Sequence, residues 1–172
     1  MKKSGLYIIS LGIESGSERI LKSTIKHLNL AKIKEKVKLI RKEGIDIAAF
    51  FVLGFPGESK EEIKKTIDFS LELDLIRANY FTFLPFPGTK SYSDLIESDE
   101  LKNVNWDNFY FTSAPYSPKN ISQKELRHYQ KRAFMKFYLR PKIIFKNLTQ
   151  IKSMKHFKFL CKRFYHWFLW TA

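Results

Sequence analysis

Cysteine is almost absent from this chain of 172 residues, since Cys161 is the single one. One thiol excludes an internal disulfide framework and any metal site built from the chain's own cysteines. The histidines offer no substitute, because His27, His128, His156 and His166 show no spacing typical of metal ligands. We therefore expect no metal ligands in this chain and a reducing, cytoplasmic location.

Long hydrophobic runs are also missing. No stretch approaches the roughly 18 apolar residues that cross a membrane. The first residues do not form a secretory signal, because the apolar run from Leu6 to Leu11 is short. Hydrophobic residues still make up 44% of the sequence and charged residues 28%, which favours a folded, soluble body.

Acidic residues are nearly absent from the last third of the chain. Residues 119–172 contain 14 Lys or Arg and one acid, Glu125, which gives +13, whereas residues 1–118 contain 17 and 16, which gives +1. The net charge of +14 therefore lies almost entirely on a basic tail. Any polyanion or anionic membrane would be recognised by this tail.

Three apolar segments have the composition of buried parallel strands. They lie at residues 6–13, 45–53 and 78–84, and each ends in a loop that contains glycine or proline. Helical patterns separate them, so the order is strand, helix, strand, helix, strand. This alternation predicts three parallel strands side by side in chain order, with two helices on one face.

Capping signals mark where the two intervening helices begin. Asn29 is the expected N-cap of a helix that runs to about Glu43. Ser59 and Glu62 have the spacing of a capping box, which predicts a second helix to about Leu73.

The basic tail is predicted to be helical. A third capping box, at Ser122 and Glu125, begins a helix to about Leu139. Pro141 interrupts it, because proline lacks the amide donor. Beyond it, apolar residues recur every three or four positions, which predicts one amphipathic helix. Its apolar positions are Ile144, Leu148, Ile151, Met154, Phe157, Leu160, Phe164 and Trp167.

Candidate binding residues follow the first strand. The Glu14 carboxylate can accept hydrogen bonds from ligand hydroxyls or an ammonium group, and Ser15 and Gly16 would let a ligand approach the backbone. The alternative is that Glu14 caps the amides of the next helix.

A second candidate loop follows the middle strand. Val52 beside Gly54 can form a flat apolar slot that suits an aromatic ring such as adenine. The alternative is that Gly54 and Gly57 simply make a tight turn around Pro56.

These loops resemble motifs of radical S-adenosylmethionine (SAM) enzymes. Residues 11–21 are similar to the fourth-strand motif of that family, residues 50–58 to its fifth strand, and residues 85–89 with Tyr92 to its sixth-strand loop. Residues 125–141 resemble the helical extension of the cobalamin-binding branch, which includes the anaerobic magnesium-protoporphyrin ester cyclase.

The resemblance implies an α/β fold, namely the last three strands of a radical SAM barrel. This partial (βα) barrel would occupy residues 1–97. An irregular connector would follow at 98–121, and a basic α-helical extension at 122–172.

The same resemblance implies that the chain holds SAM. Glu14 and Ser15 would contact its methionyl amine or ribose, Val52 and Gly54 would flank the adenine, and Leu84 would line the same face.

Two features depart from the family pattern. The three-cysteine motif that binds the family's 4Fe–4S cluster has no counterpart here, because Cys161 lies in the tail. The family's Asn-Lys-Gly run is represented by Ile25-Lys26-His27, which keeps the lysine alone. We therefore expect neither cluster nor cobalamin to be ligated by this chain, and no catalysis by it in isolation.

Two functions remain open. In the first, the chain is part of a radical SAM enzyme that modifies or methylates an unreactive carbon, with the N-terminal half of the barrel supplied by a separate chain. In the second, a non-catalytic protein binds an anionic membrane surface, or less favourably nucleic acid, through its tail. The tail has a third interpretation, in which its apolar stripe packs on the barrel and its lysines are solvated.

Overall fold

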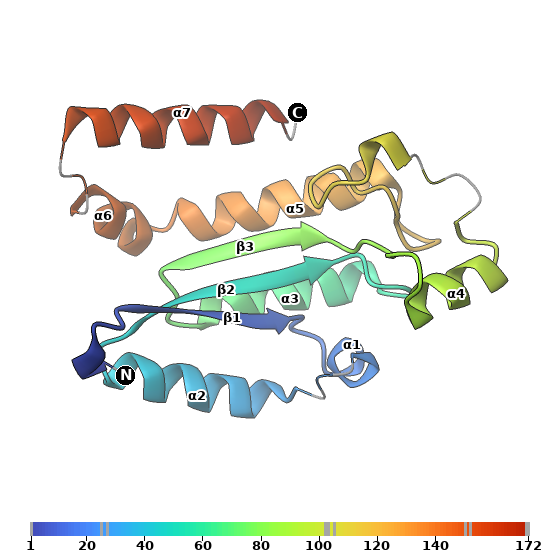
Figure 1. Ribbon diagram of the computed structural model, residues 1–172, viewed down its shortest axis with the longest axis horizontal. Coiled ribbons are helices and arrows are strands. Elements are labelled where there is room, and N and C mark those ends of the chain that lie inside the picture. The colour runs from blue at the N-terminus through green and yellow to red at the C-terminus, as the bar shows by residue number, and fades with distance from the viewer. Residues whose placement is uncertain are drawn as a thin grey trace.

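The computed structural model shows an open, three-stranded parallel sheet with helices between the strands (Figure 1). The strands β1 (Ile8–Glu14), β2 (Asp46–Leu53) and β3 (Arg77–Thr82) lie in the order β1-β2-β3. The predicted parallel strands in chain order are thus confirmed. The structure describes residues 2–24, 26, 28–101, 104, 106–149, 151 and 153–170, with the backbone alone at 156, 163, 164 and 166–170.

Helices α2 (Leu30–Lys42) and α3 (Lys60–Glu72) cover one face of the sheet (Figure 1). Both begin where the capping signals predict. The Asn29 side chain accepts a hydrogen bond from the Lys32 amide, and Ser59 and Glu62 form the complete capping box.

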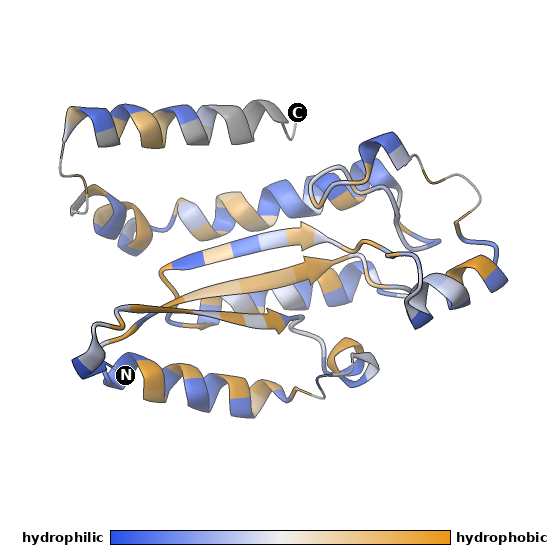
Figure 2. Ribbon diagram, viewed as in Figure 1, coloured by the Kyte–Doolittle hydropathy of each residue, from blue (hydrophilic) through white to orange (hydrophobic). Residues whose placement is uncertain are grey.

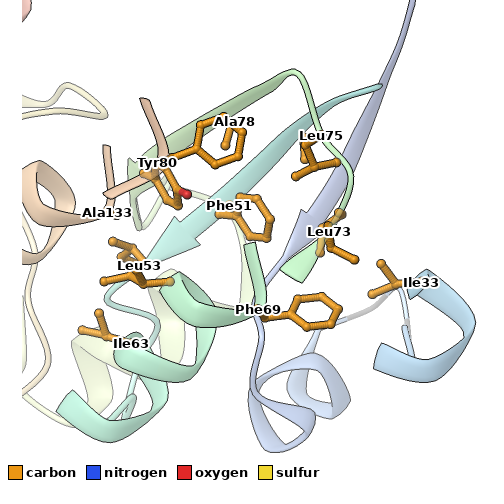
Figure 3. Close-up of a cluster of buried hydrophobic side chains, with 14 of the residues drawn as sticks. Ile33, Phe51, Leu53, Ile63, Phe69, Leu73, Leu75, Ala78, Tyr80 and Ala133 are labelled. Atoms are coloured by element: carbon orange, nitrogen blue, oxygen red, sulfur yellow. The ribbon is translucent and has the colours of Figure 1, made fainter. Parts of the chain in front are cut away.

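The core lies between the sheet and these helices. Alternate β2 residues, among them Phe51 and Leu53, are fully buried against Ile63 and Phe69 of α3 (Figure 3). Full burial of each such side chain stabilises the fold by roughly 1.5–3 kcal/mol. Figure 2 shows β2 hydrophobic along most of its length, although Phe50 and Val52, on the face away from α2 and α3, are half-buried.

Four short helical segments are additional to the predicted elements. They are the 3-10 turns η1 (Lys2–Ser4) and η2 (Trp106–Asn108), and the helices α1 (Glu18–Ser23) and α4 (Lys90–Glu97). The two α-helices are capped by hydroxyl side chains, because Ser17 accepts from the Ile20 amide and Thr89 from the Tyr92 amide. Helices of six and eight residues carry too little periodicity to stand out in a sequence.

Helix α5 (Gln123–Tyr138) begins at the predicted Ser122–Glu125 capping box and runs along the β3 side of the sheet (Figure 1). Its side chains form hydrogen bonds with the backbone groups of β3 that point away from β2. The Tyr138 hydroxyl lies 3.1 Å from the Ala78 carbonyl oxygen and 3.4 Å from its amide nitrogen. The Gln130 amide nitrogen donates to the Tyr80 carbonyl at 2.7 Å. The β3 edge is therefore closed.

The opposite edge of the sheet is open. The Asp46 amide donates to the Tyr7 carbonyl, so the alternation of a parallel ladder turns the backbone groups of Ile8, Ser10 and Gly12 away from β2. No strand among the described residues pairs with β1 on that side.

The prediction of one long helix after Pro141 is wrong. The tail forms two helices, α6 (Pro141–Thr149) and α7 (Met154–Trp170), and Ile151 lies between them. Ile151 and Ser153, which lie between the two helices, have weaker helix propensity than Lys and Leu. The structure does not describe the side chains of Phe164 and Trp167, so their predicted place on an apolar face is not tested. In the described part of the chain, no helix is long and apolar enough to cross a membrane.

Candidate functional site

A cleft of about 740 Å³ lies where the strands reach their carboxyl ends. Glu14 from β1, Val52 from β2 and Leu84 from the loop after β3 all line it. Three of the predicted site residues thus converge on one rim, while Ser15, Gly16 and Gly54 do not line the cleft. The contacts of all six residues with SAM stay predictions.

The backbone at Glu14 is in an uncommon conformation. Its φ of 70° is in the left-handed region, and the β1–β2 pairing shifts register between Gly12 and Glu14. Such conformations cost on the order of 1–3 kcal/mol in non-glycine residues, and bulges re-aim side chains at strand ends. Here the result is a carboxylate that lines the cleft. The alternative role for Glu14 is wrong, because Ser17 is the residue that caps the following helix.

Lys26 completes the polar end of the cleft. Its Nζ pairs with Glu14 Oε1, and both side chains line the cavity. Gly12 leaves room for this pair, because a Cβ there would lie 2.7 Å from both Glu14 Oε1 and Lys26 Nζ. Sequence reasoning missed this pairing, although the lysine stood out as the part of the family run that is kept. Its neighbours Ile25 and His27 lie outside the described residues.

Ser15 and Gly16 fasten the loop to helix α3. Ser15 is fully buried, with its Oγ 3.0 Å from Thr66 Oγ1, and the Gly16 amide donates to the same oxygen at 2.9 Å. A Cβ on Gly16 would lie 2.6 Å from the Lys65 carbonyl oxygen. These two residues therefore hold Glu14 in place from behind.

The loop after β2 is organised by its own glutamate. Glu58 Oε2 accepts hydrogen bonds from the amides of Gly54 at 2.5 Å and Phe55 at 3.1 Å. Gly54 and Gly57 have φ values of 83° and 68°. The tight turn around Pro56, which was the alternative to an adenine slot at this loop, is therefore present. A Cβ on Gly54 would lie 2.6 Å from a Leu126 methyl carbon.

Glu58 is also electrostatically unusual. Burial raises its pKa to about 7, against the opposing effect of the two amide donors. Its second oxygen, Oε1, has no hydrogen-bond partner among the described residues. Because both amides donate to Oε2, a bound proton would sit on Oε1.

Aromatic rings form the other wall of the cleft. On the sheet face opposite α2 and α3, Phe81 stacks on Phe50 with ring centroids 5.9 Å apart and meets Phe111 at 5.1 Å. Phe55 and Phe83 pack at 5.3 Å beside them. The cleft thus pairs an apolar wall with a charged end, which suits a ligand with a flat ring and a charged group.

The described residues contain no group of three or more His, Cys, Asp or Glu side chains that could hold a metal ion. Cys161 is exposed on α7. A 4Fe–4S cluster needs several thiolates, so these residues do not fit one.

Comparison with known proteins relates the chain to a family through part of its length. Residues 1–70 match the Radical SAM superfamily. The chain is 31% identical over 163 residues to an uncharacterized methyltransferase of Pyrococcus horikoshii, covering 95% of this chain and 34% of that protein.

Two further relatives are matched over shorter shares. The anaerobic magnesium-protoporphyrin IX monomethyl ester cyclase of Cereibacter sphaeroides is 27% identical, covering 81% of this chain and 22% of that enzyme. The cytidylyl-2-hydroxyethylphosphonate methyltransferase of Streptomyces wedmorensis is 34% identical, covering 56% of this chain and 19% of that enzyme. The chain therefore spans about a third or less of the length of these relatives.

Proposed function

We propose that this chain, which carries a partial domain of the radical SAM superfamily, is the half of a radical SAM barrel that orients SAM. The observation that carries the proposal is the convergence of Glu14, Val52 and Leu84, from three successive βα units, on one cleft. The parent reaction would be a radical-based methylation or other modification of an unreactive carbon. Two relatives whose names state methyltransferase activity support this reaction class.

The ends of the cleft match the ends of SAM chemically. Glu14 would accept hydrogen bonds from the methionyl ammonium or the ribose hydroxyls, and Lys26 would face the methionyl carboxylate. Val52 and Leu84 would contact the adenine. A volume of about 740 Å³ falls within the usual range for a small-molecule site. When SAM is bound and reduced, it supplies the radical chemistry, and the residues of this chain hold it in position.

The binding energy available from this half is small. A charge-assisted hydrogen bond to Glu14 contributes about 1.5–3 kcal/mol, and burial of a valine-sized surface about 1.5 kcal/mol. Fixing a free ligand costs from about 4 kcal/mol upward. We therefore expect weak SAM binding, millimolar at best.

The open edge of β1 supports the proposal that the barrel is completed by other residues. The outward backbone groups of Ile8, Ser10 and Gly12 are positioned to pair with a parallel strand. We propose that the N-terminal half of the barrel, in the same longer protein or on a partner chain, supplies both this strand and the cysteines of the cluster.

Titration calorimetry with SAM tests the binding site. We expect millimolar binding to the chain and its loss in Glu14→Ala. Glu61→Ala removes an exposed carboxylate from α3 and serves as the matched control. Micromolar binding that survives the loss of Glu14 would show that SAM is held elsewhere.

Reconstitution with iron and sulfide under anaerobic conditions tests the division between halves. The chain alone should yield no stoichiometric cluster, whereas co-expression with an N-terminal half that carries three closely spaced cysteines should yield a complex that holds one. A stoichiometric cluster on the chain alone, lost in Cys161→Ala, would contradict the proposal.

A further inference from the structure

The two lysines of helix α6 form ion pairs with acids of the protein body, Lys146 half-buried and Lys142 largely exposed. Lys142 Nζ lies 2.7 Å from Asp74 Oδ1, and Lys146 Nζ lies 2.7 Å from Asp46 Oδ1. Between them Ile143 is buried and belongs to the core. Helix α6 is therefore attached to the body mainly by Ile143 and by the pair of Lys146 with Asp46 at the start of β2, and the exposed Lys142–Asp74 pair adds little.

This attachment leaves the large apolar side chains of α6 on the outside. The exposed fractions are 41% for Ile144, 70% for Phe145 and 53% for Leu148. A surface helix of a soluble protein normally turns such residues inward and its lysines outward. An apolar face that stays outward on a helix attached from behind by Ile143 and Lys146 is typical of an interaction surface.

Helix α7 adds positive charge directly after this apolar face. Lys155, Lys158 and Lys162 are exposed and recur at helical spacing, so they share one side of the helix. Met154 and Phe157 are also exposed, at 69% and 41%. The sequence contains no acid after Glu125, so this segment carries no negative charge to neutralise its lysines.

We propose that α6 and α7 form a surface that binds an anionic lipid bilayer. The α7 lysines would be attracted to anionic headgroups, and Phe145 with Leu148 would enter the boundary between headgroups and acyl chains. The helices would lie in the interface, since neither is long and apolar enough to cross it. A nucleic acid would satisfy the lysines and leave Phe145 exposed, so the apolar face selects the lipid over a phosphate backbone.

Vesicle flotation of the full chain tests this surface. We expect binding to vesicles of phosphatidylcholine with about a third phosphatidylglycerol, no binding to phosphatidylcholine alone, and release as salt is raised. Lys155→Gln/Lys158→Gln/Lys162→Gln should weaken binding on the order of 100-fold. The matched control, Lys32→Gln/Lys36→Gln/Lys38→Gln on α2, removes the same charge from exposed positions and should bind as the unsubstituted chain does.

Phe145→Ser separates lipid insertion from charge attraction. It removes an exposed ring, so folding is preserved, and vesicle binding should weaken roughly tenfold or more. Equal binding by Phe145→Ser, or equal loss in the α2 control, would overturn the proposal. So would tight binding to duplex DNA by a chain that does not float with anionic vesicles. None of these readouts depends on SAM, so they fail or succeed separately from the proposed barrel function.

Discussion

Arg19 forms a bidentate ion pair with Glu62: its Nη2 lies 2.5 Å from Oε2 and its Nε lies 2.8 Å from Oε1. The same carboxylate accepts a hydrogen bond from the Ser17 hydroxyl at 2.8 Å and from the Ser59 amide at 3.0 Å. One side chain therefore joins the loop after β1, helix α1 and the first turn of α3. The Arg19 hydrogen bonds hold the pKa of Glu62 down at about 2.

Replacing this carboxylate should change stability in acid. In Glu62→Gln we expect a loss of about 1.5–3 kcal/mol at neutral pH, the usual contribution of a charge-assisted hydrogen bond. Because the folded pKa is lowered, the stabilisation is present above about pH 4.5 and disappears as pH falls toward about 2. Urea unfolding across this range should therefore show a shallower acid limb in the variant. Glu61→Gln, one residue away and exposed, should keep the original limb.

Glu58 should have the opposite effect on the pH dependence of stability. Its folded pKa is raised to about 7, so the folded state holds a proton that the unfolded chain releases near 4.5, and this carboxyl lowers stability as pH rises between these values. Glu58→Gln keeps an acceptor for the two amides and cannot ionise. We expect it to match the original chain at about pH 4, below both pKa values, and to be more stable by about 1–3 kcal/mol at about pH 8. A gain of the same size at both pH values would show that ionisation is not the cause.

Gly16 and Gly57 should differ in how much an added methyl group destabilises the fold, because the first is tightly packed and the second is open. Gly16→Ala would place a Cβ against the backbone of α3, so we expect a loss of about 3 kcal/mol. Gly57→Ala meets no atom within 4 Å, and its positive φ alone should cost about 1 kcal/mol. Urea midpoints compare the two. Equal losses would mean that Gly16 does not hold the loop against α3.

Gly12→Ala tests the ion pair rather than the fold. The added methyl would displace the tips of Glu14 and Lys26, which are flexible, so stability should change by less than about 1 kcal/mol. SAM binding should weaken on the order of tenfold, because a displaced carboxylate loses a charge-assisted hydrogen bond. Calorimetry paired with a thermal melt measures both effects. Ser10→Ala, on the same edge strand, should leave binding unchanged, and an unchanged titration in Gly12→Ala would remove the pair from the site.

The sheet and its principal helices could be predicted because their signals are local. Asn29, Ser59 and Ser122 each cap a helix through an amide three residues away, and such spacing is visible in a linear sequence. The strands stand out for the same reason, because strands of a parallel sheet read as nearly continuous apolar runs.

The geometry of the site depends on contacts that no local pattern contains. The positive φ of Glu14 follows from a bulge in its pairing with β2, and Ser15 turns inward to Thr66, 51 positions further along the chain. The Tyr138 hydroxyl reaches Ala78 across 60 positions. A residue type can suggest a ligand contact, but long-range packing decides whether that side chain faces the ligand or the core.

Closure of the β3 edge by Tyr138 and Gln130 sets a limit on self-assembly. A sheet with two open edges can extend head to tail without end, which is the route to a fibre. Here side chains of α5 occupy the β3 edge, so among the described residues the edge left for a further strand is that of β1. A second copy that docked there by two-fold symmetry would run antiparallel and would close both open edges at once. Growth of the sheet that the described residues form would therefore end once one partner edge has paired with β1.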